Sequence, residues 1–205
     1  YEFLSRGLVF DICRTPSYTG LLTEFFRRQQ GSIRSLHPTK SVCAIGPLAS
    51  ALTETHQNSP YPYAACSPYF KMTEHDGIII GLGVTTANLS FVHCCDDAMA
   101  ERFPVDPYHP QLFNALCVDY DGRSVVVQTY AHDLSKVDTH IPEYIRRYVS
   151  PSIAVDKTLY VRPFFVVKAR NFFERMMELA TEGITIYSRK HYKREFRKRT
   201  WLLLK

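Results

Sequence analysis

Hydrophobic residues recur along this chain at two spacings, one typical of helices and one typical of strands. Leucine and phenylalanine fall at helical intervals in 19–29, and leucine and alanine do so in 46–56. A third apolar stripe covers 171–180 and ends before Gly183, a residue that favours helix termination. These spacings predict three helices.

The run 78–83 is apolar without interruption and follows the turn residues Asp76-Gly77. A short run of this kind predicts a strand buried on both faces. Asn88 then stands at a position suited to capping a helix that continues to about Arg102. We therefore expect a buried strand leading directly into a helix.

The runs 115–120 and 123–130 flank Asp121-Gly122. Asp-Gly between two β-prone runs predicts a β-hairpin. A further strand is predicted over 159–167, where Pro163 indicates an edge strand or a bulge. The stretch 58–69, rich in proline and tyrosine, is predicted to be a loop.

Mixed helices and strands in 205 residues predict a single α/β domain, an α+β sandwich with a central mixed β-sheet flanked by helices. We place this domain at 1–188 and a basic C-terminal tail at 189–205. The formal charge of +5 arises in that tail, because 189–199 holds seven basic residues and one acid. The body is therefore close to neutral.

The six cysteines contain no CxxC pair, which argues against both a zinc ribbon and a disulfide framework. This usage suits a reducing compartment, so we expect a cytoplasmic protein. No apolar run approaches the roughly 20 residues that a membrane span requires. We therefore expect neither a membrane span nor a signal peptide.

The predicted helix after the buried strand carries the densest chemistry. At 100° per residue, Ser90, His93 and Asp97 share one side, and Asp96 flanks them. A histidine beside a carboxylate can keep one nitrogen as a donor and use the other as a base. The alternatives are a solvated polar helix face and a metal site with the two cysteines at 94 and 95, which point about 100° apart.

Several ordered motifs in this part of the chain resemble the aminoglycoside 3-N-acetyltransferase family. The likeness covers most of 10–135 and, more loosely, 158–182. The motifs are Arg34-Ser-Leu-His-Pro-Thr-Lys-Ser41 with the following Ala44 and Gly46, His56, Ser67-Pro-Tyr-Phe-Lys71, Asp76 to Gly83, and Ser90-Phe-Val-His-Cys-Cys-Asp96.

The resemblance implies direct acyl transfer from acetyl-CoA, a co-substrate, to an amine on a sugar, without a metal. It makes His93 the catalytic base, with Ser90 in place of the family's threonine and Asp96 in place of its glutamate. It also implies a coenzyme-binding group made of Arg34, Ser35, His37 and Ser41, and substrate-binding acids at Asp97 and Asp133. A family segment that precedes this region is expected to be missing here.

Two acceptor classes remain open: an aminoglycoside, or an amino sugar on a nucleotide or polysaccharide precursor. Other function classes are a nucleic-acid-binding module acting through 189–199, and an inactive or partial relative that binds partners through its tail. The near-neutral body carries no nucleic-acid-binding motif, so we do not expect nucleic acid as a partner. His56 and Ser67 are expected to serve structure, and the sequence does not predict an oligomeric state.

Overall fold

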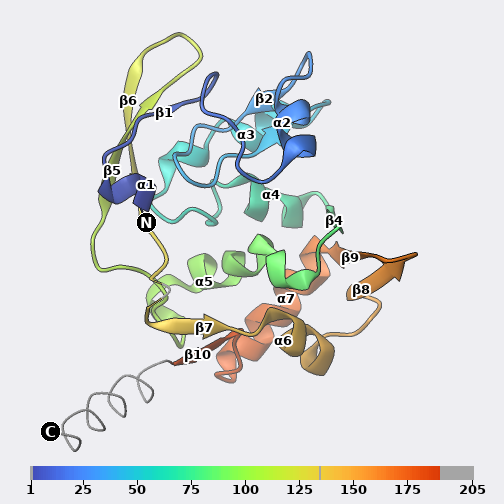
Figure 1. The fold of residues 1–205 in the computed structure, drawn as a ribbon. Coiled ribbons are helices and arrows are strands. Elements are labelled where there is room, and N and C mark those ends of the chain that lie inside the picture. Colours follow the sequence, from blue (N-terminus) through green and yellow to red (C-terminus); the bar gives the residue numbers. More distant parts are fainter. Residues whose placement is uncertain (1, 134, 190–205) are drawn as a thin grey trace, which may run out of the picture.

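The computed structural model describes residues 2–133 and 135–189 (Figure 1). Its α-helices are α1 (Glu2–Ser5), α2 (Leu21–Arg27), α3 (Ala49–Thr53), α4 (Pro68–Glu74), α5 (His93–Met99), α6 (Ile141–Tyr148) and α7 (Ala169–Thr181). Its strands are β1 (Phe10–Asp11), β2 (Ile33–Arg34), β3 (Cys43–Ala44), β4 (Ile78–Leu82), β5 (Phe113–Val118), β6 (Ser124–Thr129), β7 (Val137–Thr139), β8 (Ala154–Leu159), β9 (Arg162–Lys168) and β10 (Tyr187–Arg189).

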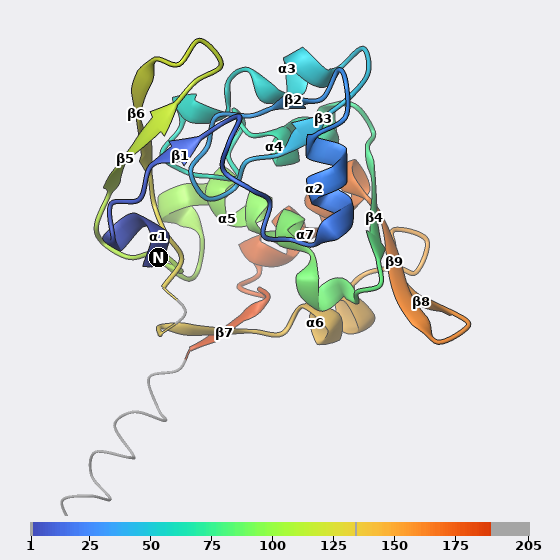
Figure 2. The ribbon, with the colours of Figure 1, turned by 45° about the horizontal axis from the view of Figure 1, so that its top comes forward.

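The strands form four small sheets, in the orders β1-β5-β6, β4-β9-β8, β2-β3 and β7-β10. Strand β1 pairs parallel to β5, and the other pairs are antiparallel, so the pairing is mixed. The β1-β5-β6 sheet and the β4-β9-β8 sheet lie on opposite sides of α5 and α7 (Figures 1 and 2). The predicted α/β class is confirmed, but within the described residues the strands do not join into one central sheet.

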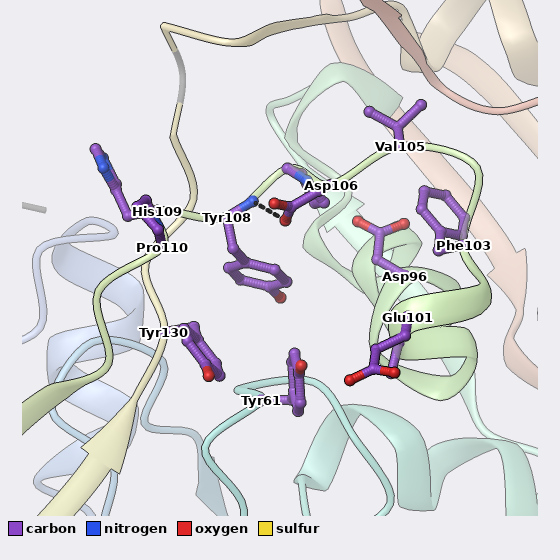
Figure 3. Close-up of a pocket in the computed structure, with 12 residues that line it drawn as sticks. Tyr61, Asp96, Glu101, Phe103, Val105, Asp106, Tyr108, His109, Pro110 and Tyr130 are labelled. Atoms are coloured by element: carbon purple, nitrogen blue, oxygen red, sulfur yellow. Dashed lines mark hydrogen bonds between the residues drawn. The ribbon is translucent and has the colours of Figure 1, made fainter.

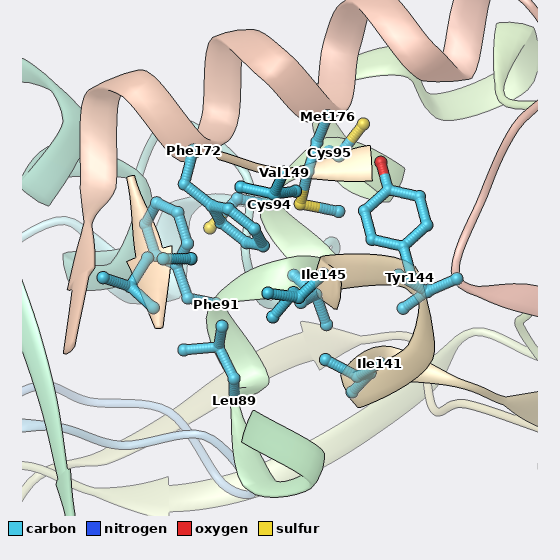
Figure 4. Close-up of a cluster of buried hydrophobic side chains, with 14 of the residues drawn as sticks. Leu89, Phe91, Cys94, Cys95, Ile141, Tyr144, Ile145, Val149, Phe172 and Met176 are labelled. Atoms are coloured by element: carbon cyan, nitrogen blue, oxygen red, sulfur yellow. The ribbon is translucent and has the colours of Figure 1, made fainter. Parts of the chain in front are cut away.

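The main core lies where α5, α6 and α7 meet (Figure 4). Helix α7 follows β9 directly and packs Phe172 and Met176 against Cys94 and Cys95 of α5. Ile145 of α6 closes the cluster from the other side. This core fixes the orientation of α5, the helix that carries the candidate site.

Helix α7 confirms the helix predicted over 171–180. After its last residue, the amide of Ile184 donates a hydrogen bond back to the carbonyl of Leu179 in the last turn. The predicted hairpin is also confirmed: β5 and β6 pair in register, with Gly122 at φ 77° in their turn. Both predictions rested on signals within one short stretch of sequence.

Strand β4 forms where predicted but is not buried on both faces. Ile78, Ile80 and Leu82 are exposed, and Gly81 between them is buried. The strand is antiparallel to β9, and an antiparallel sheet can pack one face on the core and leave the other open. The predicted helix α2 also forms, and its Leu21 and Leu22 are exposed. Apolar spacing therefore predicted where α2 and β4 lie, but not which of their side chains are buried.

Strand β9 corrects the interpretation of Pro163 as a marker of an edge or a bulge. It is the middle strand, paired with β4 and β8, and the register passes through Pro163 opposite Thr158 without an inserted residue. Pro163 is the second residue of the strand, and its carbonyl accepts a hydrogen bond from the amide of Gly83. Because it lies near the strand's start, its missing N–H costs the sheet at most one hydrogen bond.

The helix predicted over 88–102 is divided into short pieces. Two 3-10 turns, Thr86–Asn88 and Ser90–Val92, precede α5, and Asn88 lies within the first instead of capping α5. The predicted loop over 58–69 gives way to α4 at Pro68, where Ser67 accepts a hydrogen bond from the amide of Phe70 at 3.1 Å. The sequence analysis did not predict α4 or α6.

Gly81 is expected to be intolerant of any side chain. A Cβ at this position would lie 2.0 Å from the ring of Phe165, its partner on β9. We expect Gly81→Ala to lower the free energy of unfolding by about 1–3 kcal/mol, because overpacking strains a filled core. Urea unfolding measures the change, and Gly81→Ala with Phe165→Leu should recover part of it. A Gly81→Ala variant as stable as the parent would contradict this packing.

All six cysteines are free thiols. Among the described residues, no helix has the length and apolar character needed to cross a membrane. The basic tail predicted at 189–205 lies, apart from Arg189, outside the described residues. Partner binding through this tail therefore stays a prediction.

Candidate functional site

His93 begins α5, and Asp96 follows it by one turn of the same helix. The Nδ1 atom of His93 lies 3.0 Å from Oδ2 of Asp96. When Asp96 is ionised its oxygens can only accept, so Nδ1 then carries the proton and donates it to Asp96. This leaves Nε2 with a lone pair, and within the described residues no hydrogen bond engages that nitrogen.

Tyr187 of β10 completes this group from the far end of the described chain. Its hydroxyl lies 2.9 Å from Nδ1 of His93 and donates to Oδ2 of Asp96. The side chain of Asp96 is only 1% exposed, whereas that of His93 is 16% exposed. The carboxylate is therefore held inside the protein while the imidazole reaches its surface.

Burial sets the protonation of the pair. Burial, with the positive charge of Lys40 as a second cause, lowers the pKa of His93 to about 3. Burial also raises the pKa of Asp96 to about 7, although the hydrogen bond from Tyr187 acts in the opposite direction. His93 is therefore neutral near pH 7, which is the state that can accept a proton.

One cavity of about 420 Å³ opens beside His93. Ser90, Lys40, His132 and Tyr187 also line it. Ser90 and His93 thus lie on one side, as their spacing predicted. The ring of His132 lies 4.2 Å from that of His93, and its buried Nε2 has no hydrogen-bond partner in the described part of the chain.

A second cavity, of about 380 Å³, lies on the Asp96 side of α5 (Figure 3). It contains the carboxylates of Asp96, Glu101 and Asp106 and the rings of three tyrosines, at 61, 108 and 130. Tyr130 lines both cavities. Carboxylates and aromatic faces together suit a cationic ligand.

Asp97 lies one turn after His93 on α5, and its carboxylate hydrogen-bonds to residues other than His93. Its Oδ2 accepts from the amide of Tyr63 at 2.7 Å, and its Oδ1 accepts from the hydroxyl of Tyr108. Ser90 lies in the 3-10 turn before α5, so only its angle relative to His93 and Asp97 differs from that of one continuous α-helix. The side chain ties α5 to the tyrosine-rich loop.

Asp133 lies in a loop after β6. Its Oδ1 accepts from the amide and hydroxyl of Ser135, at 2.9 and 2.6 Å, and its Oδ2 lies 3.6 Å from Nδ1 of His109. The substrate-binding roles of Asp97 and Asp133 stay predictions.

The predicted coenzyme-binding group divides into two pairs. Arg34 and Ser41 line a cavity of about 550 Å³, and Arg34 Nε donates to Ser41 Oγ at 3.0 Å. Ser35 and His37 are fully buried. Ser35 Oγ bonds Nδ1 of His56 at 2.8 Å, and His37 Nδ1 accepts from the amides of Thr39 and Lys40 at 3.3 and 3.1 Å.

Ser35 and His37 therefore shape the loop that carries Thr39 and Lys40, and their contact with a coenzyme stays a prediction. His56 serves structure in the same network: its ring stacks on that of His37 with centroids 4.4 Å apart. Its Nε2 hydrogen-bonds the carbonyl of Pro62 at 2.9 Å. Burial lowers the pKa of His56 to about 4, so its ring is neutral near pH 7.

His93, Asp96 and His132 are also residue types that bind metals, and their ligand atoms lie within 4.8 Å of one another. In the structure, however, Nδ1 of His93 already lies at hydrogen-bonding distance from Oδ2 of Asp96. Cys94 and Cys95 point into the core, which raises the pKa of both thiols by burial. The His-Cys-Cys grouping considered from the sequence is therefore not assembled.

Sequence reasoning missed Tyr187, His132 and Lys40. Tyr187 is 94 positions from His93, and only the packing of β10 brings it to the site. His132 directly precedes Asp133, and Lys40 directly precedes Ser41, two residues that were predicted for the site. A search for titratable residues next to those motifs would have found them.

Comparison with known proteins identifies relatives. The family model described as aminoglycoside 3-N-acetyltransferase matches residues 2–181. Aminoglycoside N(3)-acetyltransferase IX of Micromonospora chalcea is 28% identical over 152 residues, which are 73% of this chain and 50% of that protein. Aminoglycoside N(3)-acetyltransferase III of Serratia marcescens is 33% identical over 94 residues, 45% of this chain and 35% of that one.

Solved structures share the fold. The structure of AAC-IIIb in a binary complex with CoASH superposes with a TM-score of 0.68 at 18% identity, covering 90% of this chain and 69% of that one. The structure of AAC-VIa bound to sisomicin gives a TM-score of 0.66 at 22% identity, covering 83% and 65%. The chain spans half or less of the length of these two curated relatives.

Proposed function

This chain belongs to the aminoglycoside 3-N-acetyltransferase family, and on that basis we propose that it transfers an acetyl group from acetyl-CoA to an amine of an amino sugar. The observation that carries the proposal is the hydrogen bond of 3.0 Å between His93 and Asp96 at the edge of a cavity. It holds a neutral imidazole with Nε2 free, which is the form of a general base.

In the proposed reaction, His93 Nε2 takes a proton from the attacking amine. The C–N bond to the acyl carbon forms as that proton leaves, and the C–S bond of the thioester then breaks. His93 returns the proton to the departing thiolate, which leaves as a thiol. Asp96 acts as a positioning residue, because it fixes the tautomer and stabilises the transient imidazolium.

A polycationic aminoglycoside fits the surroundings better than an amino sugar linked to a nucleotide. The cavity on the Asp96 side is lined by three carboxylates, of which those of Glu101 and Asp106 are exposed and that of Asp96 is buried. Such carboxylates bind ammonium groups and would repel the phosphates of a nucleotide sugar. The sisomicin complex of AAC-VIa, a relative by fold, is consistent with this choice.

The coenzyme is proposed to lie along the cavity that contains Arg6, Arg34 and Ser41. Its two guanidinium groups suit phosphate oxygens. Thr39 lines this cavity and also the cavity beside His93, so the two are neighbours, and the thioester arm is proposed to reach from one to the other. The CoASH complex of AAC-IIIb supports the same co-substrate.

A thiol-release assay with acetyl-CoA tests the proposal. It should use the 205-residue chain and the longest natural chain that contains it, with a panel of an aminoglycoside, free glucosamine and a nucleotide-linked amino sugar. We expect amine-dependent thiol release, fastest with the aminoglycoside. No release from either folded form would reject the activity, and fastest release with the nucleotide-linked sugar would reject the choice of acceptor.

A further inference from the structure

Lys40 places a cation in the cavity that contains the proposed base. It lines the cavity together with His93, Ser90 and His132, and its Nζ lies 5.5 Å from the centre of the Tyr63 ring. That ring in turn lies 5.1 Å from the ring of His93. Within residues 2–133 and 135–189, no ion pair or hydrogen bond engages Nζ of Lys40.

Backbone hydrogen bonds anchor the segment that carries this cation. The amide of Lys40 donates to Nδ1 of His37, whose ring is fully buried and stacked on His56. Lys40 also follows Thr39, the residue that lines both the cavity beside His93 and the cavity with Arg34. A thioester passing between the two cavities would therefore run beside Lys40.

An unpaired, partly desolvated ammonium has a use in acyl transfer. Burial lowers the pKa of Lys40, so leaving it charged in the cavity costs free energy that a bound anion would offset. Charge develops on the carbonyl oxygen when an amine attacks a thioester. No other lysine or arginine lines this cavity among the described residues.

We propose that the Lys40 ammonium holds the oxyanion of the tetrahedral intermediate while His93 moves the proton. As the amine nitrogen bonds to the acyl carbon, the π electrons of the carbonyl move to its oxygen and face Nζ. When they return, the C–S bond breaks and the thiolate takes the proton from His93. The net reaction converts an amine and a thioester into an amide and a thiol.

This inference rests on the proposed function and concerns a residue to which the sequence analysis gave no role. An oxyanion exists only after attack, so Lys40 should affect turnover more than coenzyme binding. A lysine that binds a coenzyme phosphate would show the reverse. The two roles can therefore be separated by measuring kcat and the affinity for CoA on the same variant.

The test compares Lys40→Met with Lys40→Arg, and with Lys157→Met, an exposed lysine on β8. We expect Lys40→Met to lower kcat by about 10²–10³, as for loss of one oxyanion donor. Its Kd for CoA, measured by calorimetry, should stay within about threefold. Lys40→Arg should retain more activity because it keeps the charge, and Lys157→Met should match the parent.

If Lys40→Met had the same kcat as the parent, Lys40 would not be the oxyanion donor. Thiol release by the parent would still support the proposed function. Loss of CoA affinity with kcat retained would also overturn the role of Lys40, in favour of a phosphate contact. A parent that releases no thiol with any amine would reject the proposed function, and the inference with it. Thermal unfolding checks folding in each case, and Lys40→Met should change Tm little, because the contact that Nζ makes among the described residues is with the face of the Tyr63 ring.

Discussion

Replacing His93 with alanine is expected to lower kcat by about 10²–10⁴, the range for loss of a general base. His93 supplies the only nitrogen of the Tyr187–His93–Asp96 group that is free to take the proton of the attacking amine, because Nδ1 is engaged with Asp96 and Tyr187. The rate of thiol release from acetyl-CoA with a saturating aminoglycoside measures the effect.

His75→Ala is the matched control, because His75 is exposed at the end of α4. It should retain the parent's kcat. His93→Ala should keep its affinity for CoA within about threefold, since the base acts in the chemical step and not in coenzyme binding. A folded His93→Ala variant with unchanged turnover would reject His93 as the base.

Asp96→Asn is expected to lower kcat by up to about 10⁴, through the tautomer of His93 and with little change in shape. An amide can present its NH₂ group to Nδ1, which then must accept, so the proton moves to Nε2. The nitrogen that faces the cavity would then have no lone pair. Protonated Asp96 in the parent has the same effect: its hydroxyl donates to Nδ1, the proton of His93 moves to Nε2, and Nε2 loses its lone pair.

This mechanism fixes the sign of the pH dependence. Burial raises the pKa of Asp96 to about 7, so the carboxylate gains a proton as the pH falls through 7. We therefore expect kcat of the parent to decline below about pH 7 and to level above it. Asp96→Asn should lack this limb, because the amide does not titrate.

Asp121→Asn, in the exposed turn between β5 and β6, is the control for the change of carboxylate to amide. It should keep both the rate and the pH profile of the parent. A pH profile in Asp96→Asn identical in shape to that of the parent would contradict the assignment of the limb to Asp96.

The sequence predicted those parts of the site that depend on near neighbours. His93 and Asp96 are three positions apart, so any helix at this point brings them together. The hairpin at Asp121-Gly122 was predictable for the same reason, because the turn residues and both strands lie in one stretch.

The sequence could not show contacts that depend on the packing of distant elements. Tyr187 contacts Asp96 from 91 positions away, and the packing of α6, β9 and α7 against α5 in the core brings the two together. Asp97 lies one turn after His93 on α5, but the sequence could not show which distant partners its carboxylate takes. The carboxylate binds Tyr63 and Tyr108.

Burial was equally hard to predict from apolar spacing alone. The run at β4 contains Ile78, Ile80 and Leu82, all exposed, while Gly81 faces Phe165 in the core. An unbroken apolar run is compatible with two buried faces or with one, and the partner elements decide which occurs.

The imidazole ¹⁵N spectrum of His93 near pH 8 tests most directly which of its nitrogens is free to act as the base. Histidine-labelled protein would be compared with His93→Gln to assign the resonances. We predict that Nδ1 carries the proton in the parent and that Nε2 carries it in Asp96→Asn. A parent in which Nε2 is protonated would contradict the account, because the nitrogen facing the cavity could then not accept a proton.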